Sequence, residues 1–216
     1  MKYYPINLDI KNKKCLVVGG GKIGTRKVLS LLESGGQVTV VSPEITDELK
    51  QLYIENKIEW LKRCYLSSDL DGIFLVIGAS NHENLNKEIS FAAKSKNILC
   101  NIVDKPDECN FILPAIVKRG DLVIAVSTSG KSPAFAKYLR RELEKQFDDS
   151  YNVFLNLMGE IRSKILNESN NSEHNKNIFE NLIKEGLLEL IKKRDINEIN
   201  KLLFKILGQN YKFESL

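Results

Sequence analysis

Two features of the sequence could do chemistry: a glycine-rich segment near the start and an aspartate at the end of an apolar run. Gly19, Gly21 and Gly24 have the spacing G-x-G-x-x-G, between an apolar run and a helix-like segment. In that context the first glycine makes a tight turn, the second lets the backbone approach a pyrophosphate, and the third permits close packing of helix and strand. The pattern predicts a dinucleotide site, the alternative being a glycine turn that binds no ligand.

The end of the next β-branched run should hold the group that binds the ribose. An acidic residue usually lies there, about 20 residues after the glycines. Here Ser42, Pro43 and Glu44 occupy that place. Ser42 can bind a ribose hydroxyl, and Glu44 can take the role of the usual carboxylate. No arginine stands beside them, which favours NAD over NADP. Ala79 and Ser80 follow another apolar run and are small enough to let the nicotinamide half pass.

Asp104 follows the apolar run 98–103 and should therefore lie at the carboxyl end of a strand. Open α/β sheets bind their ligands at that edge. We expect Asp104 and the preceding Val103 to lie against the nicotinamide ring, with the carboxylate partly buried. A base at this place can accept the proton that accompanies hydride transfer. The alternative is a structural aspartate that caps a helix or closes a turn.

The first 113 residues alternate between strand-like and helix-like segments, which is typical of a parallel sheet covered by helices on both faces. We expect strands over 15–18, 37–41, 58–61, 72–77 and 98–103. Pro43 should begin a turn after the second of these strands, and Asn81 should cap the helix that follows the fourth.

From Pro114 onward the pattern changes to two short strands around a turn at 119–121. Ser132 and Pro133 then provide an N-cap and a first helical residue for a helix that runs to about Phe147. The remaining chain is helical in pattern over 151–166 and 178–207, with a polar loop between these segments. The predicted fold is a Rossmann-like doubly wound α/β sheet in 1–113, a small α+β segment in 114–149 and an all-helical domain in 150–216.

Composition excludes several classes of protein. The 216 residues carry 32 basic and 28 acidic side chains, and this small excess of +4 does not favour nucleic acid. No apolar run approaches the roughly 20 residues of a membrane-spanning helix, so a cytoplasmic protein is expected. The four cysteines lack C-x-x-C spacing, and no metal site is predicted. With only two histidines, acid and base chemistry should fall to carboxylates.

Several motifs taken together resemble the precorrin-2 dehydrogenase family, to which the N-terminal module of siroheme synthase also belongs. The last two motifs are far more specific than the glycine loop, and the resemblance is close over about residues 1–147. The motifs are Cys15 to Gly24, Arg26-Lys27, Asn101 to Asp104, Phe111 to Arg119, and Ala125 to Pro133.

The resemblance implies NAD-dependent oxidation of precorrin-2 to sirohydrochlorin in siroheme biosynthesis by a homodimer. Some relatives also act as ferrochelatases that insert ferrous iron into the product, and the resemblance leaves this second activity open. Asp104 matches the family's essential aspartate. Lys22 and Ile23, like Pro43 and Glu44, match its dinucleotide contacts. Residues 114–149 would serve dimerisation and substrate binding.

The substrate itself makes further demands, because precorrin-2 is a polycarboxylate. We expect Arg119 and Lys131 to bind its carboxylates, with further donors from the hydroxyls of Ser127, Thr128 and Ser129. A rival interpretation is a non-catalytic, nucleotide-sensing Rossmann regulatory module. Such a module would need neither Asp104 nor the segment that contains these hydroxyls.

Overall fold

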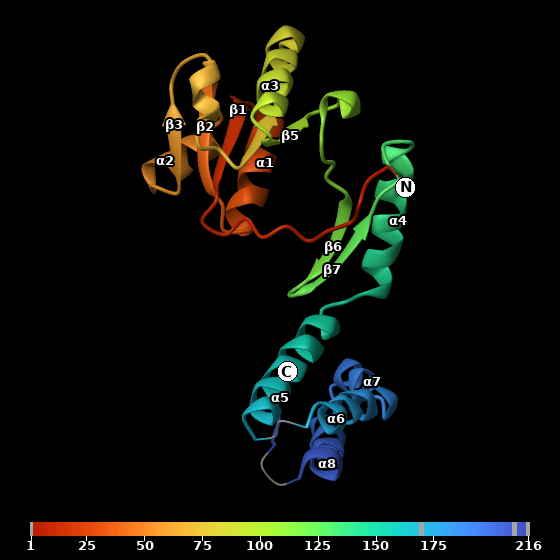
Figure 1. Ribbon diagram of the computed structural model, residues 1–216. Coiled ribbons are helices and arrows are strands. Elements are labelled where there is room, and N and C mark those ends of the chain that lie inside the picture. Colours follow the sequence, from red (N-terminus) through yellow and green to blue (C-terminus); the bar gives the residue numbers. More distant parts are fainter. Residues whose placement is uncertain (1, 169–170, 209–210, 215–216) are drawn as a thin grey trace. The chain divides into compact units, whose positions relative to one another are not determined.

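The computed structural model describes residues 2–168, 171–208 and 211–214. The chain divides into two compact units, Met1–Leu113 and Pro114–Leu216, and each unit is described by itself. Figure 1 shows the sheet of the first unit and the hairpin and helices of the second. The predicted subdivision of the second unit at residue 150 stays a prediction.

A parallel sheet forms the first unit, with the strand order β3-β2-β1-β4-β5 (Figure 1). In the central strand, Cys15 pairs with Val38 on one side and with Leu75 on the other. The strand order reverses between β1 and β4, and at such a point the carboxyl ends of the strands leave a crevice for ligands. The strands are β1 (Lys14–Gly20), β2 (Gln37–Ile45), β3 (Ile58–Leu61), β4 (Leu75–Gly78) and β5 (Leu99–Ile102).

Helices cover both faces of this sheet. Val17 of β1 belongs to the core beneath α1 and α2, while its neighbours Leu16 and Val18 belong to the core beneath α3 and η1. Alternate residues of a strand point to opposite faces, so a strand buried on both sides is apolar throughout. The Rossmann-like doubly wound fold is thereby confirmed. The helices are α1 (Lys22–Glu33), α2 (Asp47–Ile54), η1 (Ser67–Leu70), α3 (Glu83–Ser95) and η2 (Pro106–Glu108).

Three predicted boundaries in the first unit were wrong. β2 does not turn at Pro43 but continues to Ile45, which pairs with Gly20 after an irregularity in β1. β4 begins at Leu75 rather than at residue 72, because Gly72 has a positive φ and belongs to a turn. Asn81 is not the cap of α3; His82 is, without a side-chain hydrogen bond.

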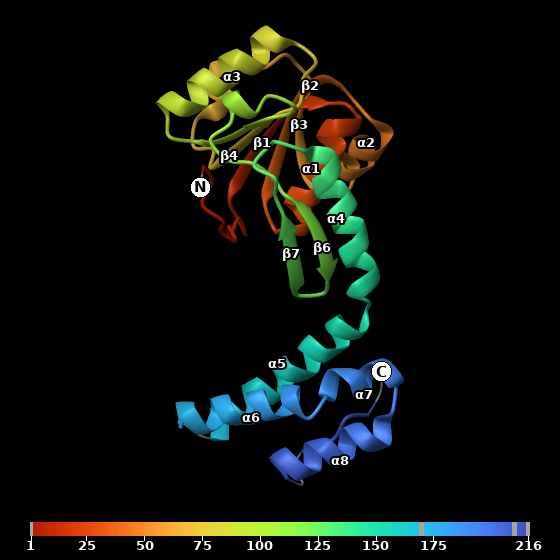
Figure 2. The same cartoon turned by 90° about the vertical axis from the view of Figure 1, so that its right-hand side faces the viewer.

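The second unit starts with a separate antiparallel pair, β6 (Ala115–Arg119) and β7 (Leu122–Val126), packed on α4 (Pro133–Gln146) (Figure 2). Buried Val117 and Ala136 come from the hairpin and the helix respectively. The predicted start of α4 is confirmed, because the Phe135 amide donates to Ser132 Oγ at 3.3 Å. Pro133 is the first helical residue, where its missing N–H costs nothing.

Four further helices surround a core of their own that includes Ile161, Leu182, Ile191 and Leu203. The predicted loop over 167–177 was wrong in its second half, because the Asn171 side chain accepts the His174 amide and begins a helix there. Within the described residues, no helix is long and apolar enough to span a membrane. The helices are α5 (Ser150–Glu168), α6 (Ser172–Lys184), α7 (Leu187–Lys193) and α8 (Ile196–Leu207).

Candidate dinucleotide and substrate site

Most glycines at the end of β1 have no room for a side chain, and Gly21 is the exception. Gly19 has φ +112°, and a Cβ there would lie 2.5 Å from the carbonyl oxygen of Ala79. A Cβ on Gly24 would overlap the Gly19 carbonyl oxygen. Gly21 differs, because a Cβ at this position would meet nothing within 4 Å. The first and third glycines of the motif are thus required by packing, and the second borders open space.

The start of α1 fits the pyrophosphate of a dinucleotide. Gly21 is its N-cap, with extended backbone and no side-chain cap, and a Cβ on this glycine would meet nothing within 4 Å. The amides of a first helical turn and the helix dipole favour an anion. Thr25 steadies the turn by donating to the Gly21 carbonyl at 3.1 Å, and its hydroxyl lies 2.8 Å from that of Thr46. Lys22 is exposed and Ile23 half-buried beside this cradle.

Ala79 and Ser80 follow the end of β4 and lie close to Gly19. The Ala79 amide donates to the Val18 carbonyl at 2.8 Å. Asn86 of α3, which is buried, donates its side-chain amide to the Ser80 carbonyl at 2.8 Å. Sequence reasoning missed Asn86, although a polar residue three positions before the buried Ile89, on the same helix face, is a detectable signal.

An indole bonds to β2 near its carboxyl end, at Ser42. Trp60 Nε1 donates to the Ser42 carbonyl at 2.9 Å, while Pro43 and Glu44 remain exposed. Lys62, just past the neighbouring β3, places its ammonium 5.7 Å from the centre of the Trp60 ring. No arginine stands next to Glu44 in the sequence, but Lys62 follows the adjacent strand, because β3 pairs with β2.

Asp104 lies just past β5, as predicted, but it is exposed rather than partly buried. Its backbone is left-handed, with φ +59°. The preceding Val103 is half-buried, and its amide donates to the Gly78 carbonyl at 3.0 Å. Because Gly78 also ends β4, this bond ties the aspartate's strand end to the dinucleotide crevice.

Lys27 of α1 has a pKa that the Asp104 carboxylate influences. Burial lowers the pKa of this half-buried ammonium, the charge of Arg26 lowers it further, and the Asp104 carboxylate partly opposes both effects. An electrostatic influence of this kind requires proximity. In the sequence, the only signal for Lys27 is the Arg26-Lys27 pair.

Beside the start of α4, the hydroxyl segment forms a tight loop. Ser129 has φ +52° and is followed by Gly130 at +83°. Thr128 Oγ1 accepts the Ser132 amide at 3.1 Å, and Ser127 Oγ accepts the Ser129 amide at 3.2 Å. The side chains of Ser127, Ser129 and Lys131 are exposed. These residues and the α4 N-terminus therefore form one local group.

Arg119 does not belong to that group. Its guanidinium donates to the Glu144 carbonyl at 3.1 Å, and this bond caps the last turn of α4. It also donates to the Lys118 carbonyl at 2.8 Å. Lys131 precedes the first turn of the same helix. Fourteen residues of α-helix separate their two ends by roughly 20 Å. Within the second unit, Arg119 and Lys131 therefore lie at opposite ends of α4.

A doubly wound sheet with an open glycine cradle at its reversal point defines a Rossmann-type protein that binds a nicotinamide dinucleotide. Residues 6–115 match the sequence model of a family described as putative NAD(P)-binding, and residues 119–146 match one described as sirohaem biosynthesis protein central. The chain therefore belongs to the family of putative NAD(P)-binding proteins, and the segment that follows is similar to the central part of sirohaem-biosynthesis proteins.

Curated relatives carry the same indication. The siroheme synthase of Vesicomyosocius okutanii is 37% identical over 198 residues, covering 92% of this chain and 42% of that protein. Siroheme synthase 1 of Yersinia enterocolitica is 34% identical over 211 residues, covering 97% and 45% respectively. The chain thus spans less than half the length of the curated relatives it matches.

Among solved structures, this chain is similar to one described as SirC, precorrin-2 dehydrogenase. The TM-score is 0.81 at 27% identity, and the match covers 96% of this chain and 100% of the other. The likeness extends over both units of the chain, so the helical tail belongs to the shared architecture.

Proposed function

We propose that this protein oxidises precorrin-2 to sirohydrochlorin with NAD as the hydride acceptor. The observation that carries the proposal is Asp104, whose strand end is bonded through Val103 to Gly78 at the dinucleotide crevice. The likeness to a solved precorrin-2 dehydrogenase supports the substrate. The two relatives named siroheme synthase support a role for this reaction in siroheme biosynthesis.

The reaction removes two hydrogens from the substrate. One leaves with its electron pair as hydride, which the nicotinamide accepts when bound, and the other leaves as a proton. Asp104 takes that proton, as an exposed carboxylate at the nicotinamide end of the crevice can do. Gly21 and the first amides of α1 hold the pyrophosphate.

Substrate carboxylates are proposed to bind in the second unit, at Lys131 and the hydroxyls of Ser127, Thr128 and Ser129. The exposure of the lysine and the N-terminal dipole of α4 support this assignment. Arg119 is a weaker candidate than the sequence suggested, because its guanidinium already binds two carbonyls.

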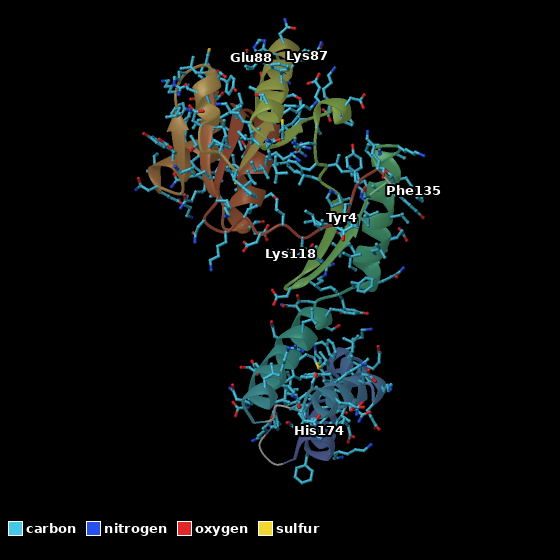
Figure 3. The ribbon with its side chains drawn as sticks, in the orientation of Figure 1. Tyr4, Lys87, Glu88, Lys118, Phe135 and His174 are labelled. Carbon is cyan, nitrogen blue, oxygen red and sulfur yellow. The ribbon has the colours of Figure 1, made fainter. Side chains whose placement is uncertain are left out.

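A homodimer formed through residues 114–149 is also proposed. A two-stranded sheet is marginal by itself, and β6 and β7 expose Ile116 and Val123 on their outer face. On α4, Phe135 is 51% exposed and stacks with Tyr138 at a ring separation of 6.2 Å. Figure 3 shows Phe135 on the side of α4 that faces away from the hairpin.

Sedimentation of the full chain at micromolar concentration tests for the dimer, and a monomer would contradict it.

The first experiment combines purified protein, precorrin-2 and NAD, and follows NADH and sirohydrochlorin together. Asp104→Ala should lower turnover by roughly 100-fold or more while the Kd for NAD stays within a few-fold. Asp107→Ala is the matched control, because Asp107 is another exposed carboxylate three residues away. Near-normal turnover in the Asp104 variant would rule out its role.

NAD binding without any turnover would instead favour the nucleotide-sensing interpretation.

The same preparation tests the second activity that the family resemblance leaves open. Under anaerobic conditions, sirohydrochlorin and ferrous iron should lose the free-base spectrum faster with the protein than without it if the chain is also a ferrochelatase. Equal rates would leave dehydrogenation as its activity.

The preference for NAD is proposed on the basis of Glu44, whose carboxylate would repel a 2′-phosphate. Lys62 at the adjacent strand end acts in the opposite direction. Glu44→Gln should therefore weaken NAD binding and raise the affinity for NADP relative to NAD by about tenfold, measured by calorimetry. Glu48→Gln on α2 is the control. An unchanged ratio of the two affinities would exclude Glu44 from cofactor selection.

A further inference from the structure

The loop that carries Asp104 begins with a tight turn. The Lys105 amide donates to the Ile102 carbonyl at 3.3 Å, which makes Asp104 the third residue of a four-residue turn. Its φ of +59° is one that a residue with a side chain adopts at a cost of roughly 1 kcal/mol. Because Asp104 is exposed, the position of its carboxylate depends on the backbone of this turn.

The sulfur of Cys109 contacts both ends of the turn. It accepts the Ile102 amide at 3.1 Å and lies 3.3 Å from the Ile102 carbonyl oxygen. It also lies 3.2 Å from the Lys105 carbonyl oxygen. A thiol has one proton, so it donates to one of these carbonyls while it accepts from the amide. Cys109 thereby connects Ile102 and Lys105, the first and last residues of the turn that contains Asp104.

The segment around Cys109 has its own anchor, independent of the turn. The Asn110 side chain accepts the Cys100 amide at 2.7 Å and donates to the Ile98 carbonyl at 2.8 Å. β5 is an edge strand, so these groups lack a neighbouring strand as partner. Cys109 and Asn110 take over part of the role of a sixth strand, and the thiol extends that pairing to the turn.

The protonation state of the thiol suits this role. Burial raises the pKa of Cys109, and the amide of Ile102 acts in the opposite direction to a smaller extent. A protonated thiol can donate to a carbonyl, whereas a thiolate would face two carbonyl oxygens without a proton between them. The contacts described above therefore belong to the neutral side chain.

We propose that Cys109 is a positioning residue, which holds the 102–105 turn so that the Asp104 carboxylate can take the substrate's proton. This inference rests on the proposed function. It adds a residue that no sequence motif pointed to, because the bonds join positions four and seven residues apart through the sulfur. A supporting side chain of this kind is what an exposed base on a loop requires.

The test compares Cys109→Ala, Cys109→Ser and the unsubstituted protein. Cys109→Ala should lower kcat for precorrin-2 oxidation at least tenfold, with the KM for NAD within twofold. Cys109→Ser keeps a donor and an acceptor and should recover kcat to within about threefold of the unsubstituted protein. Cys64→Ala, which removes an exposed thiol, is the matched control and should change nothing. A kcat for Cys109→Ala within twofold of normal would overturn the proposal.

A double variant asks whether Cys109 acts through Asp104. If it does, adding Cys109→Ala to Asp104→Ala should not lower the residual rate further. A further tenfold loss in that background would show that the cysteine acts by another route and would overturn the proposal. A serine variant as slow as the alanine variant, with equally weakened NAD binding, would indicate a merely structural role and would also overturn it.

Hydrogen exchange separates this inference from the proposed function. The Ile102 amide should exchange at least tenfold faster in Cys109→Ala than in the unsubstituted protein or in Cys109→Ser, without any substrate. Equal exchange would overturn the positioning role even if the enzyme oxidises precorrin-2. Failure of the unsubstituted protein to oxidise precorrin-2 would overturn the proposed function and, with it, the catalytic part of this inference.

Discussion

Burial decides the chemistry of several side chains in the first unit. It raises the pKa of Cys15 from the usual 9.0 to about 11, and that of Cys100 to about 12. Burial likewise raises the pKa of Tyr65 to about 12. These groups lie within the two cores of the sheet, where a charged form would lose its hydration. Cys64, by contrast, is exposed.

These shifts predict a loss of stability at alkaline pH. Between pH 9 and about 11 the two buried thiols stay protonated in the folded chain and ionise in the unfolded one. The folded state then binds more protons, so the free energy of unfolding falls as pH rises. Lys27, whose pKa is lowered, opposes this trend. Tm should therefore fall steadily from pH 9 to 11.

The variant Cys100→Ala checks the cause of this loss. It removes one of the titrating thiols and should give a shallower fall of Tm between pH 9 and 11, whatever its starting value. Cys64→Ala should keep the slope of the unsubstituted protein, because an exposed thiol has no burial to lose. Equal slopes in all three proteins would contradict the assignment of the effect to buried thiols.

In the β1–α1 connection, one glycine of the motif is needed for packing and another leaves space for a ligand, a difference that the motif alone does not show. Gly24 is required by packing, because a Cβ would overlap the Gly19 carbonyl, whereas Gly21 borders open space. The backbone of Gly21 has φ −78°, which any residue can adopt. The two positions therefore allow folding and ligand binding to be tested apart.

Gly24→Ala should lower the free energy of unfolding by about 1–3 kcal/mol, as overpacking does. Gly21→Ala should leave stability within about 1 kcal/mol while it weakens NAD binding by roughly tenfold, because its methyl group occupies the space beside the α1 amides. Denaturant unfolding and calorimetry measure the two effects. A Gly21→Ala protein with normal NAD affinity would contradict the proposed cradle.

Each compact unit has a hydrophobic core of its own. Two cores flank the sheet of the first unit, and a third lies among α5 to α8 of the second. All the proposed dinucleotide contacts belong to the first unit, whereas the proposed substrate contacts belong to the second. Asp104 lies in the first unit and Lys131 in the second, so the proposed reaction needs both.

NAD binding should therefore slow amide exchange in the first unit and not in the second. NAD at 100 times its Kd stabilises the unit that binds it by about 2.7 kcal/mol. Amide exchange should slow in β1, β4 and α1, and stay unchanged in α6 and α8. The Gly21→Ala protein at the same NAD concentration is the control. Equal protection of the helices of the second unit would contradict an assignment of the cofactor to the first unit alone.

The sequence by itself determined the doubly wound sheet, the glycine turn and the place of Asp104 at a strand end. These features follow from local patterns, because apolar periodicity sets the elements and glycine spacing sets the tight connection between strand and helix. The start of α4 followed in the same way from Ser132 and Pro133, whose effects reach only the first turn.

Only the tertiary structure decided which side chains meet. Arg119 caps the last turn of α4, and Lys62 lies over the ring of Trp60, whose indole bonds to the neighbouring β2. Cys109 binds the turn of Asp104 because the chain folds back along the open edge of the sheet. Such contacts depend on where the backbone returns, which no spacing along the chain specifies.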